Sequence, residues 1–226
     1  MNSLIQPRAT DKNMKSERSA FSTIELLVVI GIIIIIASIS VPAYISIKNN
    51  QKEKQAANEI KLIDEAIQRF RDDFGDYPNQ NILESNSAGL TDSEKSLNQG
   101  NEILVACLYS VLPDKQSKSS YLHIGLTGEG GVNLADADSD GKKELLDPWG
   151  KPYFYFPNTD YASSVSHSYG TPGLNSITAS AKAKSSGSYY RLTSYQIWSM
   201  GKNMKNDTNT SAAGSQDDDD IVNWSY

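Results

Sequence analysis

Hydrophobic residues follow two different patterns in the first third of the chain. Between Ile24 and Ile47 most residues are apolar, and the only charged side chain is that of Glu25. About 20 apolar residues are enough for a helix to cross a bilayer, so segment 21–47 is predicted to be a transmembrane helix. In segment 48–74 apolar residues recur every three or four positions, as in an amphipathic helix with one buried face. These residues are Ala56, Ile60, Ile63, Ile67, Phe70 and Phe74.

The two segments are expected to form one nearly continuous helix over about Ser22–Asp73. The Tyr77-Pro78 pair follows this segment and favours a helix end. Pro42 has no backbone N–H, so it is expected to kink or loosen the helix locally. Ser38 and Ser40 are placed to satisfy the freed carbonyls.

The rest of the chain contains fewer regular patterns. Pro152–Phe156 and Tyr189–Met200 are rich in aromatic and β-branched residues and are predicted to be strands. The apolar spacing in Asn101–Leu112 predicts a short helix. Asn79–Gly100 is polar and is expected to be a loop, and the Ser-, Gly- and Ala-rich segment Ser163–Ser188 is expected to be a mobile loop. The predicted fold class is α+β, with a long N-terminal helix packed on a small antiparallel sheet.

Glu25 is the most informative residue of the apolar segment. A carboxylate in a membrane-spanning helix costs roughly 2.5–3.5 kcal/mol on insertion scales. One interpretation is tolerance, because Glu25 lies near the helix end, where it can snorkel or be protonated. The other is that a positive charge on a partner subunit, or a newly made N-terminus, meets Glu25 inside the membrane.

The residues around Glu25 resemble those of the type IV pilin and type II secretion pseudopilin family. From Ser19 the chain reads Ser-Ala-Phe-Ser-Thr-Ile-Glu, and Pro42-Ala43-Tyr44 lies near the end of the apolar stretch. The resemblance implies that prepilin peptidase removes a cytoplasmic leader, residues 1–20, by cutting between Ala20 and Phe21. It also implies N-methylation of the Phe21 amine and pairing of Glu25 with the amine of a neighbouring subunit. Ala20 departs from the glycine usual in the family, although alanine is small enough for the same peptidase subsite.

Two later segments are similar to the major pseudopilin branch of that family. One is Asp-Pro-Trp-Gly-Lys-Pro-Tyr from Asp147, and the other is Tyr-Gln-Ile-Trp-Ser-Met-Gly from Tyr195. The likeness implies a structural subunit of a type II secretion pseudopilus or type IV pilus-like filament. Its partners would be other copies of itself, minor pseudopilins, and an inner-membrane assembly platform with its ATPase. The protein would span the bacterial inner membrane once, with residues 75–226 forming a periplasmic head.

Charge and cysteine content limit the other possibilities. The formal charge of −6 becomes about −8 without residues 1–20, because these carry four basic and two acidic side chains. Nucleic acid is therefore not an expected partner, since no basic stripe remains to neutralise phosphates. Cys107 is the only cysteine, so no intrachain disulfide can form. It lies on the apolar face of its predicted helix and is expected to be a buried, inert thiol.

The resemblance also implies a calcium ion in the C-terminal loop. Carried over residue by residue, the ligands would be Met200 through its carbonyl, Asn203, Asp218 and Asp220. Four consecutive acids near a chain end otherwise indicate a solvated tail. Ile221 and Trp224 follow them and are expected to anchor the segment to the core, where calcium could replace the missing disulfide.

A second calcium candidate comes from spacing alone. Segment 136–147 matches an EF-hand loop at positions 1, 3, 5 and 6, with Gly141 at the sharp turn. The candidate residues are Asp136, Asp138, Asp140, Lys142 and Asp147. No amphipathic helices flank this segment, so the alternative is an acidic turn held by its own hydrogen bonds.

Catalytic motifs find little support in the sequence. His123 and His167 are the only histidines, and neither has a cysteine or acid at metal or triad spacing. We therefore expect a filament subunit rather than an enzyme. The main rival is a monomeric, membrane-anchored calcium-binding domain that does not polymerise, and an anchored envelope enzyme is a more distant one.

Overall fold

The computed structural model describes residues 22–82, 97–109, 121–122, 131–161, 166–170, 176–184, 186–206 and 219–224. The chain forms two compact units, Met1–Ser46 and Ile47–Tyr226. Below, residues 22–46 are called the stem and Ile47–Tyr226 is called the folded unit. A long helix with small antiparallel sheets confirms the α+β class.

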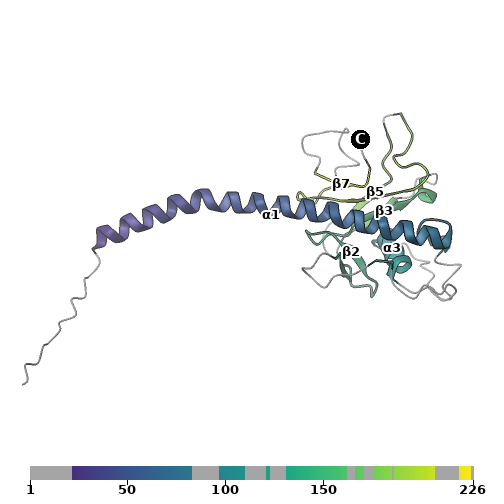
Figure 1. The fold of residues 1–226 in the computed structure, drawn as a ribbon, viewed down its shortest axis with the longest axis horizontal. Coiled ribbons are helices and arrows are strands. Elements are labelled where there is room, and N and C mark those ends of the chain that lie inside the picture. The colour runs from purple at the N-terminus through teal and green to yellow at the C-terminus, as the bar shows by residue number, and fades with distance from the viewer. Residues whose placement is uncertain are drawn as a thin grey trace, which may run out of the picture. The chain divides into compact units, whose positions relative to one another are not determined.

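Helix α1 spans Thr23–Phe74, as the sequence predicts (Figure 1). It continues through Pro42, which lies inside it. The Ser38 hydroxyl donates a hydrogen bond of 2.7 Å to the carbonyl of Ile35. Pro42 has no N–H, so the carbonyl that loses its helical partner is that of residue 38. The Ser38 hydroxyl bonds instead to a carbonyl one turn earlier. The hydroxyl of Ser38 therefore does not have the role that we expected for it.

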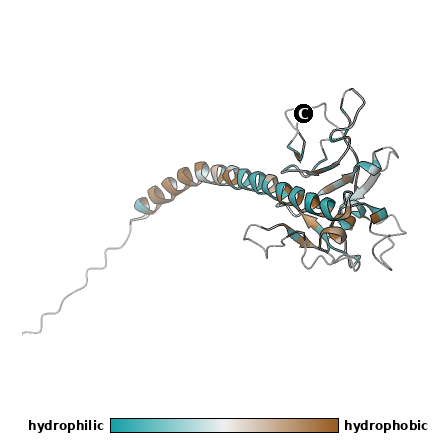
Figure 2. Cartoon of the chain, turned by 45° about the vertical axis from the view of Figure 1, so that its right-hand side comes forward, coloured by the Kyte–Doolittle hydropathy of each residue, from teal (hydrophilic) through white to brown (hydrophobic). Residues whose placement is uncertain are grey.

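The two halves of α1 differ as the hydrophobic pattern predicts. In the stem every described residue is exposed, whereas the second half carries a buried stripe. Figure 2 shows the first half in hydrophobic colours and the second half with polar and apolar residues mixed. The predicted stripe is confirmed, with Phe74 partly buried and the other members buried: Ala56, Ile60, Ile63, Ile67 and Phe70.

The described residues of the folded unit form three antiparallel sheets. The first pairs β1 (Asn133–Ala135) with β2 (Glu144–Leu146). The second has the order β3 (Phe154–Pro157), β6 (Tyr195–Ser199) and β7 (Ile221–Val222), and the short 3-10 helix η1 (Asn158–Asp160) follows β3. The third pairs β4 (Ser166–Tyr169) with β5 (Ile177–Ser180).

The sheet of β3, β6 and β7, called the central sheet from here on, separates two apolar cores. Successive side chains of a strand point to opposite faces, and β3 illustrates this. Tyr155 packs in the core that includes the buried stripe of α1. Phe154 and Phe156 pack in a second core, where both rings stack on Trp198. Because both faces are covered, all four residues of β3 are buried. The strands predicted over Pro152–Phe156 and Tyr189–Met200 are confirmed as the shorter β3 and β6.

Helix α3 (Gln99–Tyr109) confirms the short helix predicted over Asn101–Leu112. Cys107 is fully buried on it, and burial raises the pKa of the thiol to about 12, in keeping with an inert residue. The buried Asn101 side chain fixes the helix to β2 and to Tyr153, the residue before β3. Its amide donates to the carbonyls of Leu145 and Tyr153 at 3.0 and 2.7 Å, and its oxygen accepts from the Leu145 N–H at 2.7 Å.

The expectation of a loop over Ser163–Ser188 was wrong for part of that segment. β4 and β5 form an antiparallel pair there, with Tyr169 opposite Ile177. Tyr169 and Ala179 are buried in the second core. A four-residue strand has only two side chains on its buried face. Among small polar residues, two positions are too few to give a recognisable apolar alternation in the sequence.

Candidate functional sites

The stem is long and apolar enough, by length and composition, to cross a membrane. Its large apolar side chains have no cover within the described residues of the chain. Between Ile24 and Ile47 each large apolar side chain is 45–69% exposed. An apolar surface of this kind favours either lipid or another protein surface.

Glu25 caps the N-terminus of α1. The Ser22 N–H donates to the Glu25 carboxylate at 2.9 Å, while the Ser22 hydroxyl accepts from the Ile24 N–H at 3.4 Å. This arrangement is a capping box, in which a serine and a glutamate three residues later satisfy free N–H groups. The Ser-x-x-Glu spacing that begins at Ser22 is the sequence signal for this cap. The proposed cleavage position, Ala20 and Phe21, lies outside the described residues.

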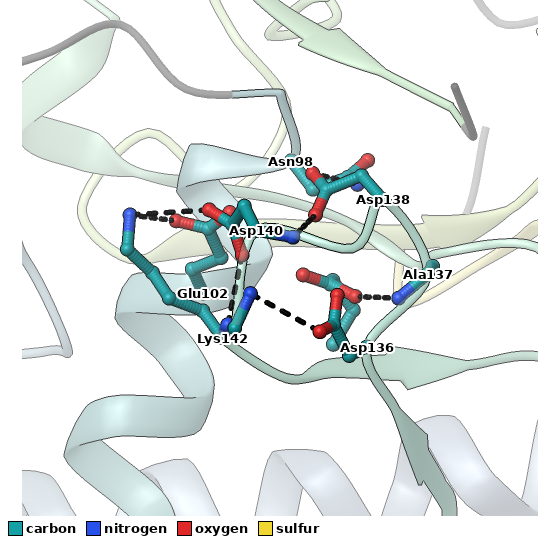
Figure 3. A network of polar contacts seen from close by, with 9 residues as sticks. Asn98, Glu102, Asp136, Ala137, Asp138, Asp140 and Lys142 are labelled. Atoms are coloured by element: carbon teal, nitrogen blue, oxygen red, sulfur yellow. Dashed lines mark hydrogen bonds and ion pairs between the residues drawn. The ribbon is translucent and has the colours of Figure 1, made fainter. Parts of the chain in front are cut away.

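Four carboxylates converge beside the N-terminal turn of α3 (Figure 3). One comes from α3, two come from the loop between β1 and β2, and one comes from the start of β2. One oxygen from each lies within 4.8 Å of the others. We call this group the acidic cluster; its members are Glu102, Asp138, Asp140 and Glu144.

The packing of α3 on β2 brings the acidic cluster together. Glu102 directly follows Asn101, which binds both the N–H and the carbonyl of Leu145. Glu144 directly precedes Leu145. The two glutamates are therefore placed on facing elements by the same set of hydrogen bonds. Glu102 is 5% exposed and Glu144 is fully buried.

Local turns position the two aspartates of the cluster. Ser139 and Gly141 have φ angles of +65° and +93°, so the loop folds back on itself. The Asp140 carboxylate accepts from the Lys142 N–H at 2.8 Å. The Asp138 carboxylate accepts from the amide of Asn98 at 3.0 Å (Figure 3). The loop is thus connected to the start of α3.

Negative charge in the acidic cluster is only partly compensated. The Lys142 ammonium lies 3.0 Å from a carboxylate oxygen of Glu102 and 3.5 Å from one of Asp140. Burial is the main cause that raises the pKa of Glu144 to about 8. Burial followed by the nearby Asp140 charge also raises the pKa of Asp138. The cluster therefore favours a bound positive charge, either a proton or a cation.

The five EF-hand candidates of segment 136–147 lie in different places. Asp138 and Asp140 lie in the acidic cluster, while one carboxylate oxygen of Asp136 accepts from the Gly141 N–H at 3.1 Å. Lys142 directs its ammonium to two of the carboxylates. Asp147 belongs to a different network, described next.

Asp147 holds a turn and connects it to β6. Its carboxylate accepts from the N–H groups of Trp149 and Lys151, both at 2.9 Å, and from the Ser199 hydroxyl at 2.6 Å. All three bonds serve the turn after β2 and its contact with the central sheet. Asp147 is 2% exposed. In place of Asp147 the structure brings in Glu144, which is position 9 of the same loop pattern, and Glu102, which no local pattern indicates.

Three of the four ligands predicted in the C-terminal loop are among the described residues, namely Met200, Asn203 and Asp220. Met200 is buried in the second core, and the Asn203 N–H donates to the Asp219 carboxylate at 2.9 Å. Asp218 lies outside the described residues, and Asp220 is partly buried. Gly201 has a φ of +64°, and a Cβ on it would collide with the backbone of Asp219.

Both apolar anchors of the C-terminal segment are in place, as predicted. Ile221 pairs with Ser199 in the sheet and packs against the first core. Trp224 packs edge-on against Trp198, with ring centroids 5.7 Å apart. The segment carrying the last two acids of the Asp217–Asp220 run is therefore attached to the core.

Comparison of the chain with known protein families, curated proteins and solved structures gives no match.

Proposed function

We propose that this chain is a structural subunit of a membrane-assembled filament, of the type IV pilin or type II secretion pseudopilus kind. The observation that supports it is the contrast within α1. One half of the helix is buried in the folded unit, and the other half has an apolar surface exposed at every described position. Such a surface can be buried in lipid before assembly and against neighbouring stems afterwards.

The free energy of burial favours a stem that lies in lipid before assembly and against neighbouring stems afterwards. Burying one Val, Leu or Ile side chain contributes about 1.5–3 kcal/mol relative to exposure in water. A stem inside a bilayer already has that contribution, so transfer into a bundle of stems changes the hydrophobic term little. Packing and polar contacts between stems then decide whether the filament forms. Glu25 is the stem's only charged residue and the natural candidate for such a contact.

In this proposal the protein acts by assembly rather than by catalysis. Prepilin peptidase removes residues 1–20, the stem remains in the inner membrane, and the folded unit lies in the periplasm. A membrane platform and its ATPase then drive subunits into the filament, with minor pseudopilins as further partners. The Glu25 carboxylate pairs with the Phe21 amine of a neighbour. The pilin-like fold, these partners and this location all belong to the proposal.

Isolation of filaments and analysis of their N-terminus tests the proposed function. Filaments sheared from cells that express the chain should contain it as the repeating unit, with a mature mass that starts at Phe21. Ala20→Trp should retain the leader and give no filaments, because a bulky side chain cannot enter a subsite made for a small residue. Ala20→Gly is the matched control and should be processed at least as well as the wild type. Retention of residues 1–20 in membrane-derived wild-type protein would contradict the proposal.

A second function is favoured by the acidic cluster. The chain could be a monomeric, membrane-anchored calcium-binding domain, since four convergent carboxylates are oxygen ligands of the kind that hard cations prefer. The same shearing experiment separates the two functions. A monomeric anchor would remain in the membrane fraction and would give no filament at any expression level.

A further inference from the structure

We propose that the acidic cluster is a calcium site that fastens α3 to the loop between β1 and β2. The cluster is confined to the folded unit, so this inference is independent of filament formation. It also differs from the C-terminal loop site that the family resemblance implies, because the cluster shares no residue with that loop.

A buried oxygen without a partner points to a ligand. Among the described residues, one carboxylate oxygen of Glu144 accepts from the Ala137 N–H at 2.6 Å. The other oxygen is inaccessible and has no hydrogen-bond partner. Leaving a buried polar atom without a partner is unfavourable, and more so if the atom is charged. The residue is fully buried, and an oxygen of its carboxylate is one of the four that converge.

Ligand chemistry favours calcium over smaller cations. Calcium takes six to eight oxygens at about 2.3–2.6 Å in a flexible geometry, and the four oxygens of the acidic cluster, which lie within 4.8 Å of one another, can all reach one such ion. Magnesium keeps several waters and is usually bound by one or two carboxylates, whereas four converge here. Zinc usually takes nitrogen or sulfur ligands, whereas all four groups here are carboxylates.

Lys142 serves as a competing cation in this site. Its ammonium contacts two of the four carboxylates, yet its side chain is 44% exposed and has room to turn toward solvent. A calcium ion would place two positive charges at the centre of the cluster, instead of the single positive charge of the Lys142 ammonium at its edge. Removing the ammonium should therefore strengthen calcium binding, which is an effect opposite to that of removing a ligand.

Bound calcium would join elements distant in sequence. It would connect the first turn of α3 to the β1–β2 loop and to the start of β2. Asn98 extends this connection, because its amide donates to Asp138 and to the carbonyl of Gly170, which directly follows β4. The ion would thus do for this part of the folded unit what a disulfide does in other small domains.

The test is calcium titration of the full chain purified in detergent and freed of metal. Calorimetry gives the affinity, and thermal unfolding with and without calcium gives a second measurement. At 100 times the dissociation constant we expect an increase in Tm of about 5–10 °C. Magnesium at the same concentration should give a much smaller shift. Equal or tighter binding of magnesium would overturn the assignment to calcium.

Variants locate the site within the chain. Glu144→Gln should weaken calcium binding at least tenfold, and the exposed Asp140→Asn should do the same with little risk to folding. Lys142→Gln should tighten it. The pair Asp218→Asn with Asp220→Asn is the matched control and should leave the acidic cluster's affinity unchanged. Asp136→Asn should weaken binding less than a ligand variant does, because the Asp136 charge acts on Asp138 from beside the cluster. Wild-type affinity in both Glu144→Gln and Asp140→Asn, or a loss in Asp136→Asn equal to that in Glu144→Gln, would overturn the proposal.

Discussion

The two halves of α1 use the same backbone structure for opposite purposes. In the second half, Ile63, Ile67 and Phe70 are fully buried against α3 and the central sheet. In the stem, Ile33 and Ile36 are both 58% exposed, and no described part of the chain covers them. The difference arises from sequence pattern, since one half has a single apolar stripe and the other is apolar all round. The folded unit has a buried core of its own, whereas the apolar surface of the stem is exposed to whatever surrounds the described part of the chain.

The glutamates of the two halves show the same contrast. Glu59 is 4% exposed and accepts hydrogen bonds from the Tyr153 hydroxyl at 2.6 Å and the Gln55 amide at 2.8 Å. Glu25 is exposed, and within the described part of the chain its carboxylate accepts from the Ser22 N–H at its own helix end. One carboxylate therefore has its partners within the protein. The other has the capacity to accept a partner from another molecule.

The largest expected effect comes from removing the charge at Glu25. Glu25→Gln preserves the capping box, because glutamine can accept the same N–H, but it leaves the neighbour's amine without a counter-charge. Breaking a buried ion pair costs about 3–5 kcal/mol, so filament yield should fall by at least about tenfold. Membrane insertion should be unchanged or improved, because a charge is removed from the bilayer. Filament yield and membrane level are measured in the same cells.

Two variants sharpen this test. Glu25→Val removes both the cap and the charge and should behave as Glu25→Gln does. Ser22→Ala removes the hydroxyl cap and retains the charge, so filament yield should stay near the wild-type level. If Glu25→Gln assembled normally and only Glu25→Val failed, the carboxylate would be a helix cap and not an assembly contact.

The second effect concerns stability and separates the two halves of α1. Phe70→Ala should destabilise the folded unit by about 3–5 kcal/mol, because it leaves a cavity in a fully packed core. Phe70 stacks on Phe74 with ring centroids 4.4 Å apart, so the loss extends to its neighbour. Ile33→Ala in the stem should leave the stability of the folded unit unchanged. Thermal unfolding in detergent compares the two, and equal losses would mean that the halves are energetically coupled.

Local pattern predicted the fold well where the apolar positions repeat. α1 was predicted to within about one residue at each end, since its first half is a continuous apolar run of membrane-spanning length and its second half has a helical apolar period. The core strands β3 and β6 were found from their aromatic residues. β4 and β5 were missed because each has few buried side chains among serine and glycine residues, and their structure depends on pairing with each other.

The acidic cluster could be predicted only in part. The spacing of Asp138 and Asp140 suggested a cation loop, and Glu144 has the place of a ligand in the same pattern. Glu102 could not be assigned, because its proximity depends on the docking of α3 through Asn101, which no local pattern reveals. Asp147 lies outside the acidic cluster, because its carboxylate is bound to the turn that follows it and to Ser199.

The smallest expected effect is the pH dependence of folding stability that comes from Glu59, the buried glutamate of α1. Burial is the main cause that raises the pKa of Glu59 above its ordinary value of 4.5, and the nearby Asp147 charge acts in the same direction. The folded protein therefore holds this proton to higher pH than the unfolded chain does. Its contribution to stability is greatest below about pH 4.5 and is lost as pH rises through the raised pKa.

Glu59→Gln tests this contribution, because glutamine keeps a similar shape and can bond to both Tyr153 and Gln55. Relative to the wild type, the variant should gain stability steadily as pH rises from about 4.5 to 7. The stability difference between the two proteins is measured by thermal unfolding at each pH, so other titrating groups cancel. Filament yield should not change, in contrast to Glu25→Gln. A stability difference that stays constant with pH would mean that the folded unit holds Glu59 ionised as readily as water does.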